Sequence, residues 1–201
     1  MTSPHTRERI RDEAAALFRE KGFNGTSMSD LAKAVGITKS SLYHHFPSKQ
    51  ALLAEIVELT VNRVSPLVQQ VADSDRPVDE RLGNAVAIHT VAAIHDQDAV
   101  ACFTEEGRYL SPEFMAPHIV ERDRYELIFR QMFEEGMTSG AFVPQDADLA
   151  VKAILGMCNS VVRWYRPGGT HTPEQIAEDF ARFAVRGATW ATTPAVRASA
   201  S

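Results

Sequence analysis

The chain has 201 residues, 44% of them apolar and 23% charged, which is the composition of an ordinary soluble globular protein with a substantial core. A membrane protein or secreted precursor is not expected, because no uncharged apolar run approaches the roughly 18 residues of a membrane span and no signal-peptide core is visible. The net charge is −5, yet residues 1–50 carry eight basic and five acidic side chains, so a basic end that favours phosphate contact precedes an acidic remainder.

The N-terminal part predicts two helices before a sharp turn. The second of them covers about residues 30–35, and either Ser27 or Ser29 can cap it. The first covers about residues 6–21, ends at Gly22 and shows an apolar stripe at helical spacing, made of Ile10, Ala14, Leu17 and Phe18.

A third, short helix is predicted over residues 39–46. Gly36 suits the positive φ of the turn before it, Thr38 is a good N-cap, and Pro47 stops the helix. The pair of short helices predicts a helix-turn-helix whose second helix reads DNA. The outward surface of that helix is polar and free of carboxylates, as insertion into a major groove requires; it consists of Lys39, Ser40, Ser41 and His44.

Many spaced positions over the first quarter of the chain make up a specific pattern: Ala15, Phe18, Gly22, Thr26, Leu31, Ala32, Ala34, Val35, Gly36, Leu42, Tyr43, His44, His45, Phe46, Ser48, Lys49, Gln50, Ala51 and Leu52. With this pattern the segment resembles the DNA-binding domain of the TetR family of transcriptional regulators. One departure is Ser40, where the family commonly has glycine. Serine is also small, so it permits close approach to DNA but can change which base is read.

We expect a reader of this kind to bind double-stranded DNA at a palindromic operator. The candidates for contacts with base edges are Lys39, Ser40 and Ser41. The candidates for phosphate contacts, which position the protein rather than specify the sequence, are Thr26, Thr38, Tyr43, His44 and Lys49. For Thr26, a simple helix cap is the alternative interpretation.

The remainder predicts further helices and no strand, so the fold class is all-α: a TetR-like three-helix helix-turn-helix domain followed by a helical bundle. A long helix runs from Lys49 into the low 70s, and Pro66 should bend or interrupt it. The later helices cover about residues 78–95, 99–110, 112–139, 146–165 and 173–190. We expect the DNA-binding domain at 1–50, the effector-binding and dimerisation domain at 51–192, and a disordered tail at 193–201.

The last two predicted helices are apolar over more than one side. A helix with two apolar sides needs two partners, which burial within one chain or a second copy can supply. In the family that the N-terminal part resembles, the corresponding helices form a four-helix interface with a twofold mate. The resemblance therefore implies a homodimer that presents two reading helices.

A distinctive run follows in the penultimate helix, Arg163-Trp164-Tyr165-Arg166. Arg163 and Arg166 are three apart on a helix and share a face, with Asn159 one turn earlier. Two guanidinium groups suit a phosphorylated or carboxylated ligand, and Trp164 or Tyr165 can stack on a planar ring. Equally, basic residues suit a helix C-terminus, and aromatic residues pack at a dimer edge.

This run is similar to one in a branch of TetR regulators that sense acyl-CoA thioesters during steroid or fatty-acid breakdown. The resemblance implies that Arg163 helps to hold the CoA portion. An aromatic residue is expected at the position of Asn159 in the sterol-sensing members, which leaves the acyl group open. Phe103, Glu106 and Arg108 lie in a segment similar to one that lines the cavity of this branch, although a solvated helix face is the alternative for Glu106 and Arg108.

Neither a metal site nor a catalytic motif is evident, and no cofactor is expected. Cys102 and Cys158 do not suggest a disulfide framework, so we expect buried, reduced thiols in a cytoplasmic protein. The favoured hypothesis is a repressor released from DNA by an acyl-CoA-type effector. Two rivals stay open: a regulator that senses a hydrophobic or cationic drug through Phe103, Glu105 and Glu106, and a small helical enzyme acting on CoA esters.

Overall fold

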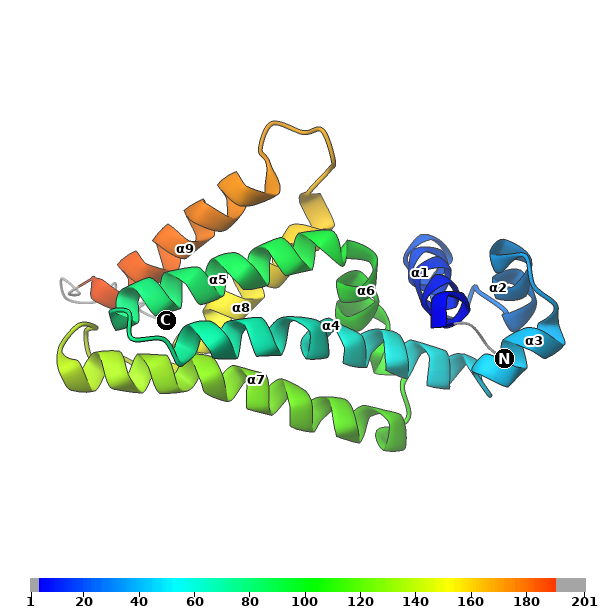
Figure 1. Ribbon diagram of the computed structural model, residues 1–201, viewed down its shortest axis with the longest axis horizontal. Helices are drawn as coiled ribbons and strands as arrows, with labels where there is room; N and C mark the ends of the chain where they lie inside the picture. Colours follow the sequence, from blue (N-terminus) through cyan, green and yellow to red (C-terminus); the bar gives the residue numbers. More distant parts are fainter. Residues whose placement is uncertain (1–3, 191–201) are drawn as a thin grey trace, which may run out of the picture.

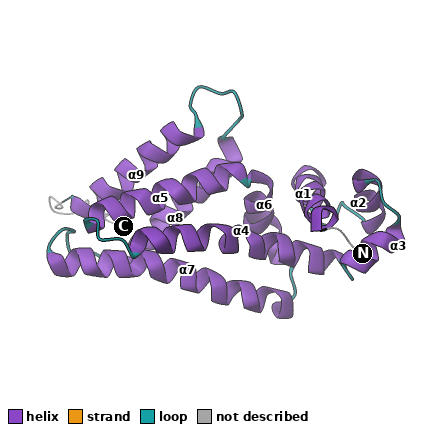
Figure 2. Cartoon of the chain, in the orientation of Figure 1, coloured by secondary structure: helices purple, strands orange, loops and turns teal. Residues whose placement is uncertain are grey.

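The computed structural model describes residues 4–190, and every regular element in that range is helical (Figures 1 and 2). The predicted all-α class is confirmed for this part of the chain, and none of its helices is long and apolar enough to cross a bilayer. The predicted tail at 193–201 lies outside the described residues. In chain order the α-helices are α1 (Pro4–Lys21), α2 (Met28–Val35), α3 (Lys39–His45), α4 (Lys49–Ala72), α5 (Val78–His95), α6 (Gln97–Ala101), α7 (Pro112–Ser139), α8 (Ala147–Trp164) and α9 (Pro173–Thr189).

A small head forms one end of the molecule, on the right in Figure 1, where α1, α2 and α3 gather around the start of α4. Its core is built from the apolar stripes of these four helices. The fully buried members include Ile10, Phe18, Leu31, Leu42, Leu52 and Leu53. Because α3 buries Leu42 in this core, its opposite face is left for a partner outside the head.

The body is a bundle in which α5 packs against α4, α7, α8 and α9. Its core joins side chains from all five helices, among them Val68, Leu82, Phe129, Phe133, Cys158 and Ala184. The helix α4 begins in the head and runs into the body beside α7 (Figure 1). It continues through Pro66 without interruption, so the two parts are joined by a continuous helix.

The segment after α5 differs from the single helix predicted over residues 99–110. It begins earlier, at Gln97, and changes geometry twice: α6 is followed by a π-helical turn (Cys102–Glu106) and a 3₁₀ turn (Gly107–Tyr109). This irregular stretch contacts the head: Glu106 accepts the backbone N–H of Phe23 at 2.9 Å, and Cys102 donates to the carbonyl of Ala15 at 3.4 Å. The spacing of apolar residues along a helix does not reveal tertiary contacts of this kind, so they could not be predicted from it.

Candidate functional site

The turn between α2 and α3 is fixed by three local devices. Ser27 and Asp30 form a capping box at the start of α2. Gly36 closes α2 in the left-handed region at φ 74°, which a side chain would strain. Thr38 then caps α3 by accepting the N–H of Ser41 at 3.1 Å. The predicted helix-turn-helix is thus set by its own short-range hydrogen bonds.

The outward face of α3 is polar and accessible. Lys39, Ser40 and His44 are exposed, Ser41 is half-buried, and Tyr43 exposes 44% of its surface. Thr38, exposed beside them, keeps its hydroxyl on the helix cap. The face presents cationic and hydroxyl groups without a carboxylate, which is the chemistry needed beside bases and phosphates.

Thr26 does not belong to this face, contrary to the prediction of a phosphate contact. Its side chain is 1% exposed, and its hydroxyl donates to the carbonyl of Gly22 at 3.0 Å. The hydroxyl therefore secures the turn after α1, close to the alternative role of a local cap.

Lys49 is also engaged within the head rather than free for phosphate. Its ammonium donates to the carbonyls of Phe23 and Thr26 and lies 4.2 Å from the centre of the Phe23 ring. Burial lowers the pKa of this ammonium group. The structure therefore gives Lys49 a role that the predicted phosphate contact does not include, because its side chain ties the turn after α1 to the start of α4.

Replacing Lys49 with methionine should destabilise the head by about 2 kcal/mol, since two carbonyls lose a charged donor. Urea unfolding measures this loss, with Lys33→Met on the exposed side of α2 as the matched control. The dependence of DNA affinity on salt should stay unchanged. A shallower salt dependence at unaltered stability would restore the phosphate role.

The head is bonded to the segment around α6. Arg19 of α1 pairs with Asp98 at 2.6 Å and donates to the carbonyl of Val162, in the last turn of α8, at 3.2 Å. Gln97 donates to the same carbonyl at 2.7 Å. Together with the bond from Phe23 to Glu106, these contacts join the head, the α6 segment and the end of α8 in one network.

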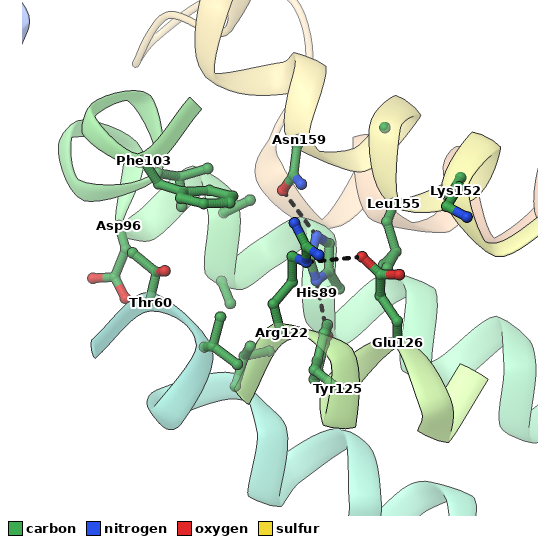
Figure 3. Close-up of a pocket in the computed structure, with 16 residues that line it drawn as sticks. Thr60, His89, Asp96, Phe103, Arg122, Tyr125, Glu126, Lys152, Leu155 and Asn159 are labelled. Carbon is green, nitrogen blue, oxygen red and sulfur yellow. Dashed lines mark hydrogen bonds and ion pairs between the residues drawn. The ribbon is translucent and has the colours of Figure 1, made fainter. Parts of the chain in front are cut away.

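A cavity of about 210 Å³ lies in the body beside this network (Figure 3). It is lined by α4, α5, α7 and α8 and by the segment carrying Phe103, and it opens to the surface. Most of its wall is aliphatic or aromatic, as expected of a pocket for a small organic ligand. The apolar lining consists of Val61, Val64, Ala92, Ala93, Val100, Phe103 and Leu155.

Three polar side chains from different helices meet at the cavity wall. His89 of α5 lies between Tyr125 of α7 and Asn159 of α8, with Nδ1 2.8 Å from the tyrosine hydroxyl and Nε2 3.0 Å from the asparagine Oδ1 (Figure 3). Burial lowers the pKa of His89 to about 4, although the hydrogen bond with Asn159 opposes this. The imidazole is therefore neutral near pH 7.

The charged residues of the lining are largely paired. Asp96 accepts from Arg63 at 3.0 Å, and Glu126 lies 3.5 Å from Arg122, an ion pair drawn in Figure 3. Lys152 is exposed at the edge of the cavity. The cavity therefore offers a neutral polar wall inside and positive charge near its rim.

The predicted ligand residues are only partly brought together. Asn159 and Phe103 line the cavity, whereas Arg163 and Trp164 are exposed beyond it, and Arg163 lies 3.9 Å from Glu105. The prediction that Arg163 and Arg166 share a helix face is wrong: α8 ends at Trp164, Tyr165 is extended, and Arg166 folds back to donate to the carbonyl of Tyr165.

Glu106 and Arg108 do not line the cavity either. Glu106 faces the head through its bond to Phe23, and Arg108 is exposed, lying 5.0 Å from the centre of the Tyr109 ring. Glu106 is thus a contact between head and body, and the alternative of a solvated position holds for Arg108.

The sequence interpretation missed His89 and Tyr125. The only signal was a histidine on the apolar stripe of the helix at 78–95, and histidines in such places commonly pack in a core. Both thiols are buried as predicted, and burial raises the pKa of Cys102 to about 12 and that of Cys158 to about 11. Among residues 4–190, no cluster of three or more His, Cys, Asp or Glu side chains could hold a metal ion.

Comparison with known proteins agrees with this geometry. Residues 10–56 match the family model of bacterial regulatory proteins of the tetR family, and residues 75–188 match the tetracyclin repressor-like C-terminal domain. The HTH-type transcriptional repressor KstR2 of Mycobacterium tuberculosis is 29% identical over 178 residues, which cover 88% of this chain and 89% of KstR2.

Two solved structures are also similar. The regulator PfmR of Thermus thermophilus superposes with a TM-score of 0.82 at 34% identity, covering 89% of this chain and 97% of PfmR. AibR, solved in complex with isovaleryl coenzyme A and operator DNA, gives a TM-score of 0.78 at 26% identity, covering 89% of this chain and 97% of AibR.

Proposed function

Because this chain belongs to the TetR family of DNA-binding transcriptional regulators, we propose that it is a homodimeric repressor that leaves a palindromic operator when an acyl-CoA-type effector binds. The observation that carries the proposal is the cavity in the body, whose wall includes Phe103 of the segment bonded to the head. Occupation of that cavity and the position of the reading helix are thereby linked through contacts within one chain.

The DNA contacts proposed for the head follow from exposure. Lys39, Ser40 and Ser41 at the start of α3 reach base edges, where lysine donates to guanine and serine suits either purine. Thr38, Tyr43 and His44 lie around them and meet phosphates, which fix the register of the helix on the duplex. A single helix of this length reads one half-site, so a palindrome needs two copies.

The dimer is proposed to form through α8 and α9. Both helices carry large apolar side chains that solvent reaches, Leu149, Trp164 and Phe183, the last of them 65% exposed. A shallow groove of about 220 Å³ between the two helices is lined by small residues such as Ala150, Ala153 and Gly187. Bulky side chains beside small ones are what two close-packed helix pairs require.

The effector is proposed to place its acyl group in the cavity and its CoA portion outside. A volume of about 210 Å³ takes a short acyl chain but not the nucleotide of CoA. Lys152 at the rim and Arg163, one turn beyond Asn159 on α8, are exposed cations that can meet phosphates. The relative AibR, which was solved with isovaleryl coenzyme A, supports this ligand class.

Release of DNA is proposed to run through the α6 segment. Asp96 and Phe103 line the cavity, and between them Asp98 holds Arg19 of the head. A ligand that displaces Phe103 shifts the π-helical turn, and the bonds of Asp98 and Glu106 pass this shift to α1. The effector must favour the released state, because equal affinity for both states would shift nothing.

A cationic drug is less compatible with the lining. The two carboxylates of the cavity, Asp96 and Glu126, are already paired with Arg63 and Arg122. A cation would have to displace one of these arginines, at the cost of leaving a guanidinium group without its partner.

Short-chain CoA thioesters should weaken DNA binding by at least about tenfold, a typical allosteric coupling. The measurement is fluorescence anisotropy of a duplex selected by this protein, with free CoA and a hydrophobic cation as controls. Release by the cation alone would favour the drug-sensing rival. Hydrolysis of the thioester without any DNA binding would favour the enzyme.

A further inference from the structure

The hydrogen bonds at the cavity wall have one direction. Asn159 turns its amide oxygen toward Nε2 of His89, so that nitrogen must carry the proton (Figure 3). A neutral imidazole has a single N–H, which leaves Nδ1 as an acceptor. The hydroxyl of Tyr125, 2.8 Å away, must then donate to it. The chain of donors runs from Tyr125 through His89 to Asn159.

Two of the three residues in this row of hydrogen bonds use their donors within it, and the last has a donor left over. Tyr125 donates its hydroxyl proton to His89, and His89 donates its N–H to Asn159. Among the hydrogen bonds of the described residues, the amide nitrogen of Asn159 donates to none, although Asn159 lines the cavity. In the reverse arrangement the amide N–H₂ group would donate to Nε2, Nδ1–H would donate to the tyrosine hydroxyl, and the amide oxygen would face the cavity.

The surroundings restrict what this amide can bind. Leu155, Phe103 and Val100 share the cavity wall with Asn159, so an oxygen placed there meets a fixed donor in largely apolar surroundings. His89 stays uncharged near neutral pH, Arg122 is already paired with Asp123 and Glu126, and Lys152 lies at the exposed edge, so the inner wall has no unpaired positive charge for a buried carboxylate. The matching group is an uncharged oxygen.

We propose that Asn159 determines effector specificity by donating a hydrogen bond to an uncharged carbonyl oxygen on the acyl chain, beyond the thioester, with His89 and Tyr125 as positioning residues that fix the amide. The effector class is thereby narrowed from any short acyl thioester to one that carries an oxo group. This inference rests on the proposed function, because it takes the cavity to be the site of the acyl group.

The test compares three CoA thioesters of equal chain length by isothermal titration calorimetry: acetoacetyl-CoA, 3-hydroxybutyryl-CoA and butyryl-CoA. Acetoacetyl-CoA should bind up to about tenfold more tightly than butyryl-CoA, the gain of one hydrogen bond. Asn159→Leu should abolish this preference while retaining butyryl-CoA binding. Asn84→Leu, the same exchange at an exposed position of α5 outside the cavity, should leave the preference intact.

The outcomes separate the inference from the proposed function. Equal affinity for acetoacetyl-CoA and butyryl-CoA in the unmutated protein overturns the role of Asn159 and leaves a CoA effector in place, and it needs no variant to fold. A preference for 3-hydroxybutyryl-CoA alone means that the amide presents its oxygen, which also overturns the proposal. If none of the three thioesters binds, the proposed CoA effector is contradicted, and the inference that rests on it falls too.

Discussion

Replacing Phe183 with aspartate is expected to turn the dimer into monomers and to lower DNA affinity by at least about 100-fold, because two linked readers gain this much over one. Phe183 projects from α9 beside the groove lined by Ala150, Ala153 and Gly187. In a twofold arrangement each aspartate would be buried against an apolar face without a cation. Burying an unpaired carboxylate costs far more free energy than leaving it exposed on the surface.

Sedimentation equilibrium measures the first effect and anisotropy with a selected duplex the second. Asn84→Asp adds the same charge at an exposed position of α5 and should change neither quantity. A Phe183→Asp protein that remains a dimer with full DNA affinity would place the interface elsewhere.

Acidification should destabilise the body through His89. Burial lowers the pKa of His89 to about 4, against 6.5 for a free imidazole, so the unfolded chain takes up a proton that the folded chain resists. The stability that the folded chain gains by keeping His89 neutral is fully present above pH 6.5 and is lost as the pH falls from 6.5 to about 4. The loss amounts to about 3 kcal/mol of unfolding free energy.

Urea unfolding at a series of pH values between these limits measures this loss. The matched variant is His89→Gln, which keeps a polar side chain but has no group that titrates in this range. Its stability should fall less steeply on acidification, and the difference between the two profiles isolates His89 from His118, whose pKa burial also lowers. Parallel profiles for the two proteins would show that His89 is not held neutral by burial.

Local rules predicted the head well. The N-cap at Thr38 and the positive φ of Gly36 depend on neighbours within a few residues, and the structure has both where the sequence placed them. The capping box of Thr172 and Gln175 at the start of α9, in the body, is a feature of the same local kind. Features of this kind can be read from one sequence because their partners lie in the same turn.

Residues whose partners are far away in the chain were predicted poorly. Lys49 looked like a phosphate contact, but its ammonium group is held by carbonyls from the turn after α1. Glu106 looked like part of a pocket, but it bonds to Phe23, 83 positions earlier. The cavity itself depends on the meeting of His89, Tyr125 and Asn159 from three helices, which no periodicity in any one helix reveals.

The central claim is that two copies of α3 enter successive major grooves of one duplex. It is tested most directly by selecting binding sites from a random duplex library with the purified protein and then footprinting the protein on the enriched duplexes. The account predicts an inverted repeat with protection of two half-sites whose centres lie about 34 Å, or a multiple of it, apart. Absence of enrichment, or protection of a single half-site, would contradict it.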